Sequence, residues 1–147
     1  IAVYSTITSG TLYSVPALKE NDGFQEKYFI DFVDHECHLR LRRAGWSVWW
    51  ETEAEIYHRL GKIQRMTKEG LWIEHEPYRY YYMARNMTEG YWRLGGMRAL
   101  LGLEREILHH IRRLRKEGEA PAESILYICK GMKDAFLGKS GPLRGER

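Results

Sequence analysis

The sequence predicts an α/β chain of the α+β kind, with a mixed amino-terminal part and a helical carboxyl-terminal part. Short stretches rich in Val, Tyr, Thr and Trp occur before residue 60, and apolar residues recur every three or four positions after residue 76. A polar segment connects the two patterns. We therefore expect two regions, 1–75 and 76–147.

The composition is that of a globular chain. Of 147 residues, 44% are hydrophobic and 29% are charged, which excludes a disordered chain. The net charge of +3 is too small to indicate nucleic-acid binding. Only two cysteines occur, Cys37 and Cys129, so we expect a reducing cytoplasmic setting rather than a disulfide-stapled secreted domain.

The amino-terminal region is expected to hold a few strands around one short helix. Its opening, IAVYSTITSGTLYSVPAL, is rich in strand-forming residues, with a bend or bulge at Ser9-Gly10. The helix is expected over 34–45, because Asp34 suits an N-cap and Gly45 suits a helix stop. Cys37 and Leu41 are expected on its buried side, with the remaining polar residues of HECH near the surface. Strands are expected over 46–51 and 54–60.

The carboxyl-terminal region is expected to form three helices. Apolar stripes indicate helices at 77–94 and 121–136, each opened by a proline, and a third between them. The middle helix, 98–116, is basic, with Arg112, Arg113, Arg115 and Lys116 at its end. These cations either form a solvated face that complements the helix dipole, or attract anionic lipid.

Asp34 has two interpretations. As a helix cap it would accept backbone N–H groups, and as a general base it would accept a proton from a hydroxyl nucleophile. Asp31 either supports it as the second of two paired carboxylates, or is solvated, or pairs with Lys27 or an arginine. His58 is either a hydrogen-bonded structural residue or a metal ligand at the end of a strand.

The stretch DGFQEKYFIDFVDHECHLRLRRAGWSVWWETEAEIYHRLG resembles the carboxyl half of family 2 glycosyltransferases of the GT-A fold, most closely bacterial rhamnosyltransferases. The resemblance covers about Thr6 to Asn86. The residues that carry it are Ser9, Gly10, Gly23, Phe24, Glu26, Phe29, Ile30, Asp31, Val33, Asp34, Glu36, Leu39, Arg40, Arg42, Gly45 and His58, with the later segment YRYYYMARN.

The resemblance implies an inverting hexosyltransferase of bacterial cell-surface polysaccharide. Asp34 would be the catalytic base, with Asp31 supporting it, and the sugar donor would be dTDP-rhamnose. His58 would be a ligand of Mg²⁺ or Mn²⁺, since oxygen-preferring ions suit a leaving diphosphate. Substrate contacts are expected from Ser9, Gly10, Arg40 and Trp50, and the acceptor would be a saccharide or a lipid-linked sugar.

The resemblance also implies that turnover needs a nucleotide-binding part and further metal ligands. The family's nucleotide-binding strands and its D-x-D metal motif are not found in this sequence, so the chain corresponds to the acceptor-side half and the metal would be completed from outside it. We expect little or no transferase activity from the chain alone. A cytoplasmic location at the inner face of the membrane and a homodimer through the helical tail are further expectations.

Two other classes of function remain open on the sequence. The chain could be a non-catalytic helical interaction module in which Asp34 only caps a helix. It could also be a zinc hydrolase that uses His35, His38 and His58. The aromatic residues Trp46, Trp49, Trp50, Tyr57 and Trp72 would either stack on sugar rings or form the core.

Overall fold

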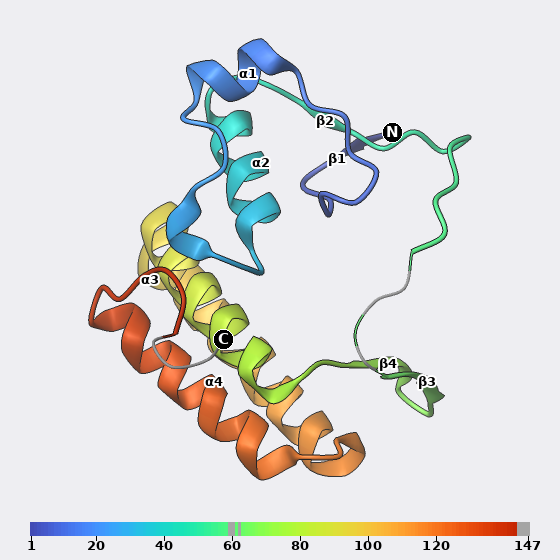
Figure 1. Ribbon diagram of the computed structural model, residues 1–147, viewed down its shortest axis with the longest axis vertical. Helices are drawn as coiled ribbons and strands as arrows, with labels where there is room; N and C mark the ends of the chain where they lie inside the picture. The colour runs from blue at the N-terminus through green and yellow to red at the C-terminus, as the bar shows by residue number, and fades with distance from the viewer. Residues whose placement is uncertain (59–60, 62, 144–147) are drawn as a thin grey trace. The chain divides into compact units, whose positions relative to one another are not determined.

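The computed structural model describes residues 1–58, 61 and 63–143 (Figure 1). In chain order the elements are β1 (Ala2–Val3), α1 (Val15–Glu20), the 3₁₀ turn η1 (Glu26–Tyr28), α2 (Val33–Arg43), β2 (Val48–Trp49), β3 (Ile63–Thr67), β4 (Gly70–Glu74), α3 (Pro77–Glu117) and α4 (Pro121–Phe136). Small antiparallel sheets and longer helices confirm the mixed α+β class.

The chain divides into two compact units. The first comprises Ile1–His58 together with the segment that begins at Gly141, and the second holds the β3–β4 hairpin with α3 and α4. This division by packing falls inside the region 1–75 that the sequence suggests as one domain. The boundary at residue 75 stays a prediction.

In the first unit, α2 packs against α1 while β1 pairs with β2. The core consists of Ala17, Cys37 and Leu41, with Tyr13 and Leu18 packed against it. Burial of Cys37 and Leu41 confirms the predicted inner face of α2. The surface position expected for the other residues of HECH is wrong for two of them, because Glu36 and His38 are 0% and 2% exposed.

Helix α2 begins differently from the prediction. Its N-cap is Phe32, whose φ of 65° is left-handed and whose side chain makes no capping bond, so the predicted cap at Asp34 is wrong. Asp34 is instead the second residue of the helix. At the other end, Gly45 (φ 93°) allows the N–H of Trp46 to bond to the carbonyl of Leu41 at 3.0 Å, which closes the last turn as predicted.

The predicted strands after α2 are mostly wrong. Only Val48–Trp49 of the range 46–51 forms a strand, in register with Ala2–Val3. Within 54–60, residues 54–58 form none, and residues 59 and 60 lie outside the described part of the chain. Ile56 and Tyr57 are 61% and 96% exposed, and an extended segment without a hydrogen-bonded neighbour is not a strand.

The second unit contains a hairpin where the sequence suggests only a polar connector. Strands β3 and β4 pair from Ile63↔Glu74 to Thr67↔Gly70. Gly70 supplies a φ of 100° at the turn. Trp72 points inward from β4 and is 1% exposed, so this hairpin contributes the largest side chain of the core.

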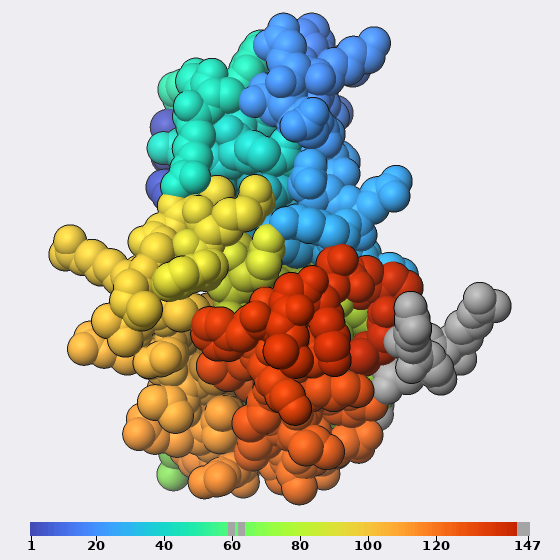
Figure 2. Space-filling model, turned by 90° about the vertical axis from the view of Figure 1, so that its left-hand side faces the viewer, coloured from blue at the N-terminus to red at the C-terminus, as the bar shows by residue number. Residues whose placement is uncertain are grey.

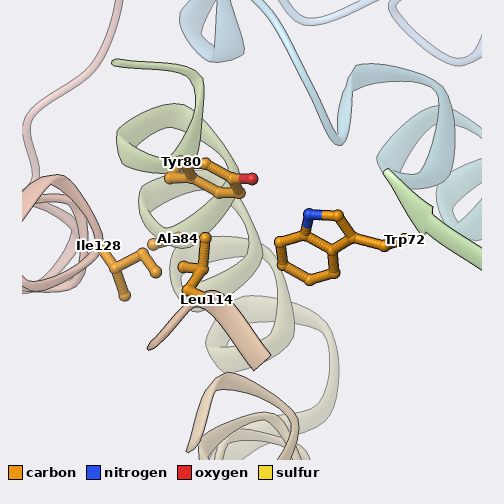
Figure 3. Packing of buried hydrophobic residues seen from close by; sticks show 5 residues of the cluster. All are labelled: Trp72, Tyr80, Ala84, Leu114 and Ile128. Atoms are coloured by element: carbon orange, nitrogen blue, oxygen red, sulfur yellow. The ribbon is translucent and has the colours of Figure 1, made fainter. Parts of the chain in front are cut away.

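Three helical segments follow, as predicted. Helix α3 is interrupted at Gly96, where φ is 62° and ψ is −158°, so residues before and after it form two segments. These segments and α4 pack closely together (Figure 2). Their core joins Trp72, Tyr80, Ala84, Leu114 and Ile128, contributed by β4, α3 and α4 (Figure 3).

A buried polar network also joins α3 to α4. The Tyr81 hydroxyl donates to an Asp134 carboxylate oxygen at 3.1 Å, and Lys139 pairs with the same carboxylate at 2.9 Å. This pairing of a nearly buried acid stabilises the contact between the helices. Among the described residues, no helix has both the length and the apolarity needed to cross a membrane.

Candidate functional site

Asp34 anchors the loop that carries Ser9 and Gly10. Its Oδ2 accepts the backbone N–H of Thr8 at 3.0 Å and lies 3.4 Å from the Thr8 hydroxyl, while its Oδ1 accepts the N–H of His35 at 2.9 Å. The side chain is half-buried. Each carboxylate oxygen has a second lone pair, so these bonds leave acceptor capacity on both oxygens.

Further bonds from α2 fix the same loop. The N–H of Thr6 donates to Nδ1 of His38 at 3.3 Å, and the Ser5 hydroxyl lies 2.6 Å from Nδ1 of His35. Burial lowers the pKa of His38, which favours the neutral ring that accepts this N–H. His38 is therefore a positioning residue for the loop, and no sequence motif pointed to that role.

Glycine is favoured at position 10 because its φ of 77° is left-handed. The side chain of Ile56 lies directly against it. The neighbouring Ser9 hydroxyl lies 3.3 Å from Nε2 of His58. The Ser9-Gly10 bend is thus held next to the segment 54–58, which the sequence places far away.

A cleft of about 680 Å³ opens beside this bend. It is lined by Thr6, Ser9, Gly10, Thr11, Leu12, Trp49, Trp50, Glu51, Ala54, Glu55, Ile56 and Tyr57. Three of the four residues expected to contact substrate, Ser9, Gly10 and Trp50, therefore lie along one hollow. Trp50 is 62% exposed, so its indole face is available for stacking on a flat or ring-shaped ligand.

Asp34 is not part of the lining of this cleft. It holds Thr8, the residue immediately before Ser9, which lines the cleft. The carboxylate and the cleft are thus neighbours along the loop. Asp31 is half-buried just before α2 with a left-handed φ of 60°.

Arg40, the fourth residue expected to contact substrate, is engaged elsewhere. Its Nε and one terminal nitrogen donate to the carboxylate of buried Glu36 at 3.1 Å each, and the same terminal nitrogen donates to the carbonyl of Gly23 at 2.6 Å. Arg40 is not among the residues that line the cleft. Through these contacts the Arg40 side chain has a structural role, because it joins α2 to the turn at residue 23.

The three histidines of the zinc hypothesis do not form a metal site. His35 and His38 both approach the Ser5 hydroxyl, whereas His58 bonds to Ser9. Among the described residues, no group of three His, Cys, Asp or Glu side chains is placed to hold a metal ion. For a magnesium-type ion, which prefers several oxygen ligands, these residues supply at most His58 and do not fit by themselves.

Comparisons with family models, with curated proteins and with solved structures found no match for this chain. The assignment of a function therefore depends on the residues and their geometry.

Proposed function

We propose that this chain forms the acceptor side of an inverting glycosyltransferase of the rhamnosyltransferase type. The observation that carries the proposal is that one short loop is bonded to a carboxylate at Thr8 and lines a substrate-sized cleft from Ser9 onward. Asp34 holds the loop at Thr8, and the next residues, Ser9 and Gly10, line the cleft with Trp50. The motif residues of the resemblance thus meet in one part of the first unit.

In the proposed reaction, a saccharide acceptor presents a hydroxyl to Asp34. The carboxylate takes the hydroxyl proton as the oxygen attacks the anomeric carbon of the donor sugar. The bond between that carbon and the diphosphate oxygen breaks, and the diphosphate leaves with the electron pair. Attack from the face opposite the leaving group inverts the anomeric configuration.

The donor side of the reaction requires groups outside the described residues. We assign dTDP-rhamnose as the donor, and we assign a saccharide or a lipid-linked sugar at the cytoplasmic face of the membrane as the acceptor. Within this chain, His58 is the residue that we assign as a ligand of Mg²⁺ or Mn²⁺ near the diphosphate. Such an ion neutralises charge on the leaving group when bound.

A turnover assay tests this proposal. Release of dTDP from dTDP-rhamnose is measured for the chain alone and for a protein in which a nucleotide-binding half with a D-x-D motif is joined before Ile1. We expect acceptor-dependent release from the joined protein and little or none from the chain alone. Equal release from both, or none from the joined protein with any of a panel of saccharide acceptors, would contradict the proposal.

A non-catalytic interaction module is the second candidate. Exposed apolar side chains on and just beyond α4 favour it, since Leu126 and Leu137 are 68% and 60% exposed and lie on one face. A homodimer through this face would dissociate when both leucines are changed to serine. Sedimentation velocity of the two proteins distinguishes this function from catalysis, which does not depend on these residues.

A further inference from the structure

The second segment of α3 carries a regular stripe of basic and apolar side chains on its outer surface. The positions are three or four residues apart, so they lie on one helical face. All are exposed, and they are Arg98, Leu101, Arg105, Leu108, Arg112 and Arg115. We call these six residues the Arg/Leu stripe. In Figure 2, side chains of this gold and orange part of α3 extend outward from the surface.

The four arginines of the stripe are free of partners within the described part of the chain. The other two cations at the end of α3 are engaged: Lys116 pairs with Glu69 at 2.6 Å, and Arg113 lies 5.0 Å above the ring of Trp72. The internal contacts of the second unit therefore use one side of the helix end. The stripe on the outer side is left with four uncompensated positive charges.

The stripe also exposes apolar side chains between the charges. Leu101 and Leu108 are 54% and 53% exposed, and Met97, just before the stripe, is 58% exposed. Leucines at these positions gain nothing from a purely polar polyanion such as duplex DNA. A second copy of the same face would bring four arginines against four arginines, which is repulsive.

A surface with negative headgroups over an apolar layer satisfies both kinds of side chain. Arginines then contact phosphates while leucines enter the boundary between headgroups and acyl chains. From Arg98 to Arg115 the helix rises about 26 Å at 1.5 Å per residue, which is long enough to contact several lipids. We propose that the Arg/Leu stripe docks this chain on a membrane that contains anionic phospholipid, with the helix parallel to the membrane plane.

Vesicle sedimentation with the complete chain tests the docking. The probes are vesicles of equal parts phosphatidylcholine and phosphatidylglycerol, with pure phosphatidylcholine vesicles beside them. We expect binding to the anionic vesicles only. Since each basic residue near an anionic surface contributes roughly a factor of five, Arg105→Glu with Arg112→Glu should lower the partition coefficient at least about thirtyfold.

A matched control separates the stripe from the net charge. Lys68→Glu with Lys133→Glu makes the same change of charge at two exposed lysines away from the stripe, and it should lower binding far less. Leu101→Ser with Leu108→Ser should lower binding while it leaves the charge unchanged. Leu71→Ser, which removes a comparably exposed leucine (50%) from β4, should have no effect.

Three results would overturn the proposal. They are equal losses from the stripe variant and its lysine control, equal binding to both kinds of vesicle, and tighter binding to a DNA duplex than to anionic vesicles. Circular dichroism confirms that each variant remains folded. Because the assay uses no sugar donor, its outcome is independent of the proposed transferase activity.

Discussion

Glu36 is a fully buried carboxylate that pairs with Arg40 at 3.1 Å. Removing the guanidinium takes away the positive charge that Arg40 supplies to this acid, and breaking such a buried pair typically costs about 3–5 kcal/mol. We therefore predict that Arg40→Ala lowers the free energy of unfolding by about 3 kcal/mol in urea titration. Arg112→Ala is the control, since Arg112 is exposed and belongs to the Arg/Leu stripe, and it should change stability by less than about 0.5 kcal/mol.

An equal effect of the two variants would show that the Glu36–Arg40 pair contributes nothing to stability. The same experiment bears on the cleft, because Arg40 is one of the residues expected to contact substrate. A large loss of stability in Arg40→Ala would support the structural role that the bonds of Arg40 to Glu36 and Gly23 indicate.

His110 makes stability depend on pH. Burial, followed by the positive charge of Arg113, lowers the pKa of His110 from 6.5 to about 4. Below pH 6.5 the unfolded chain binds a proton that the folded chain does not bind until about pH 4. The free energy of unfolding therefore falls as the pH drops through this window, by on the order of 3 kcal/mol.

The variant His110→Phe isolates this contribution from that of other titrating groups. Phe keeps an aromatic ring between Trp72 and Tyr80, where His110 is stacked, and cannot be protonated. We predict that its stability relative to the original chain rises as the pH is lowered from 7 to 4.5. Parallel curves for His110→Phe and the original chain would contradict the assignment.

At the scale of elements, the contact between α3 and α4 depends on Gly131. A Cβ at this position would collide with the carbonyl oxygen of Tyr81 on the facing helix. Gly131→Ala should therefore lower the free energy of unfolding of the second unit by about 1–3 kcal/mol, since overpacking forces the helices apart. The measurement is the urea midpoint followed by tryptophan fluorescence.

Gly102 provides the opposite control within α3. A Cβ there meets nothing within 4 Å, so Gly102→Ala should stabilise the helix by up to about 1 kcal/mol through helix propensity. Opposite signs for the two substitutions are expected. Stabilisation by Gly131→Ala would show that the two helices do not approach each other as closely as described.

Long periodic elements could be predicted from the sequence, and short ones could not. The stripes of α3 and α4 bury one face at helical spacing, which a local pattern records directly. Helix α2 was predicted within two residues at each end because Gly45 marks its stop. The β3–β4 hairpin was missed because Trp72 is the one buried apolar residue among the side chains that the structure describes in these short strands. The segment 54–58 was predicted as a strand but has no neighbouring strand with which it pairs.

At the scale of the whole molecule, the candidate site was partly predictable. The resemblance implies substrate contacts at Ser9, Gly10 and Trp50, and these three residues lie along one cleft. Their role in binding stays a prediction. The bonds of Thr8 to Asp34 and of Thr6 to His38 join segments about thirty residues apart, so no local pattern reports them.

The role of Asp34 as a base separates a transferase from an interaction module, and one substitution tests it most directly. Asp34→Asn keeps the shape of the side chain and an oxygen that can accept the N–H of Thr8, but it removes the basic carboxylate and gives up the bond from the N–H of His35. In the joined protein with its nucleotide-binding half, we predict that kcat falls at least about a hundredfold, while the loss of one hydrogen bond lowers the free energy of unfolding by only about 1 kcal/mol. Asp22→Asn, in the exposed turn before η1, should leave kcat unaltered. Turnover by Asp34→Asn within a few-fold of the original protein would contradict the account.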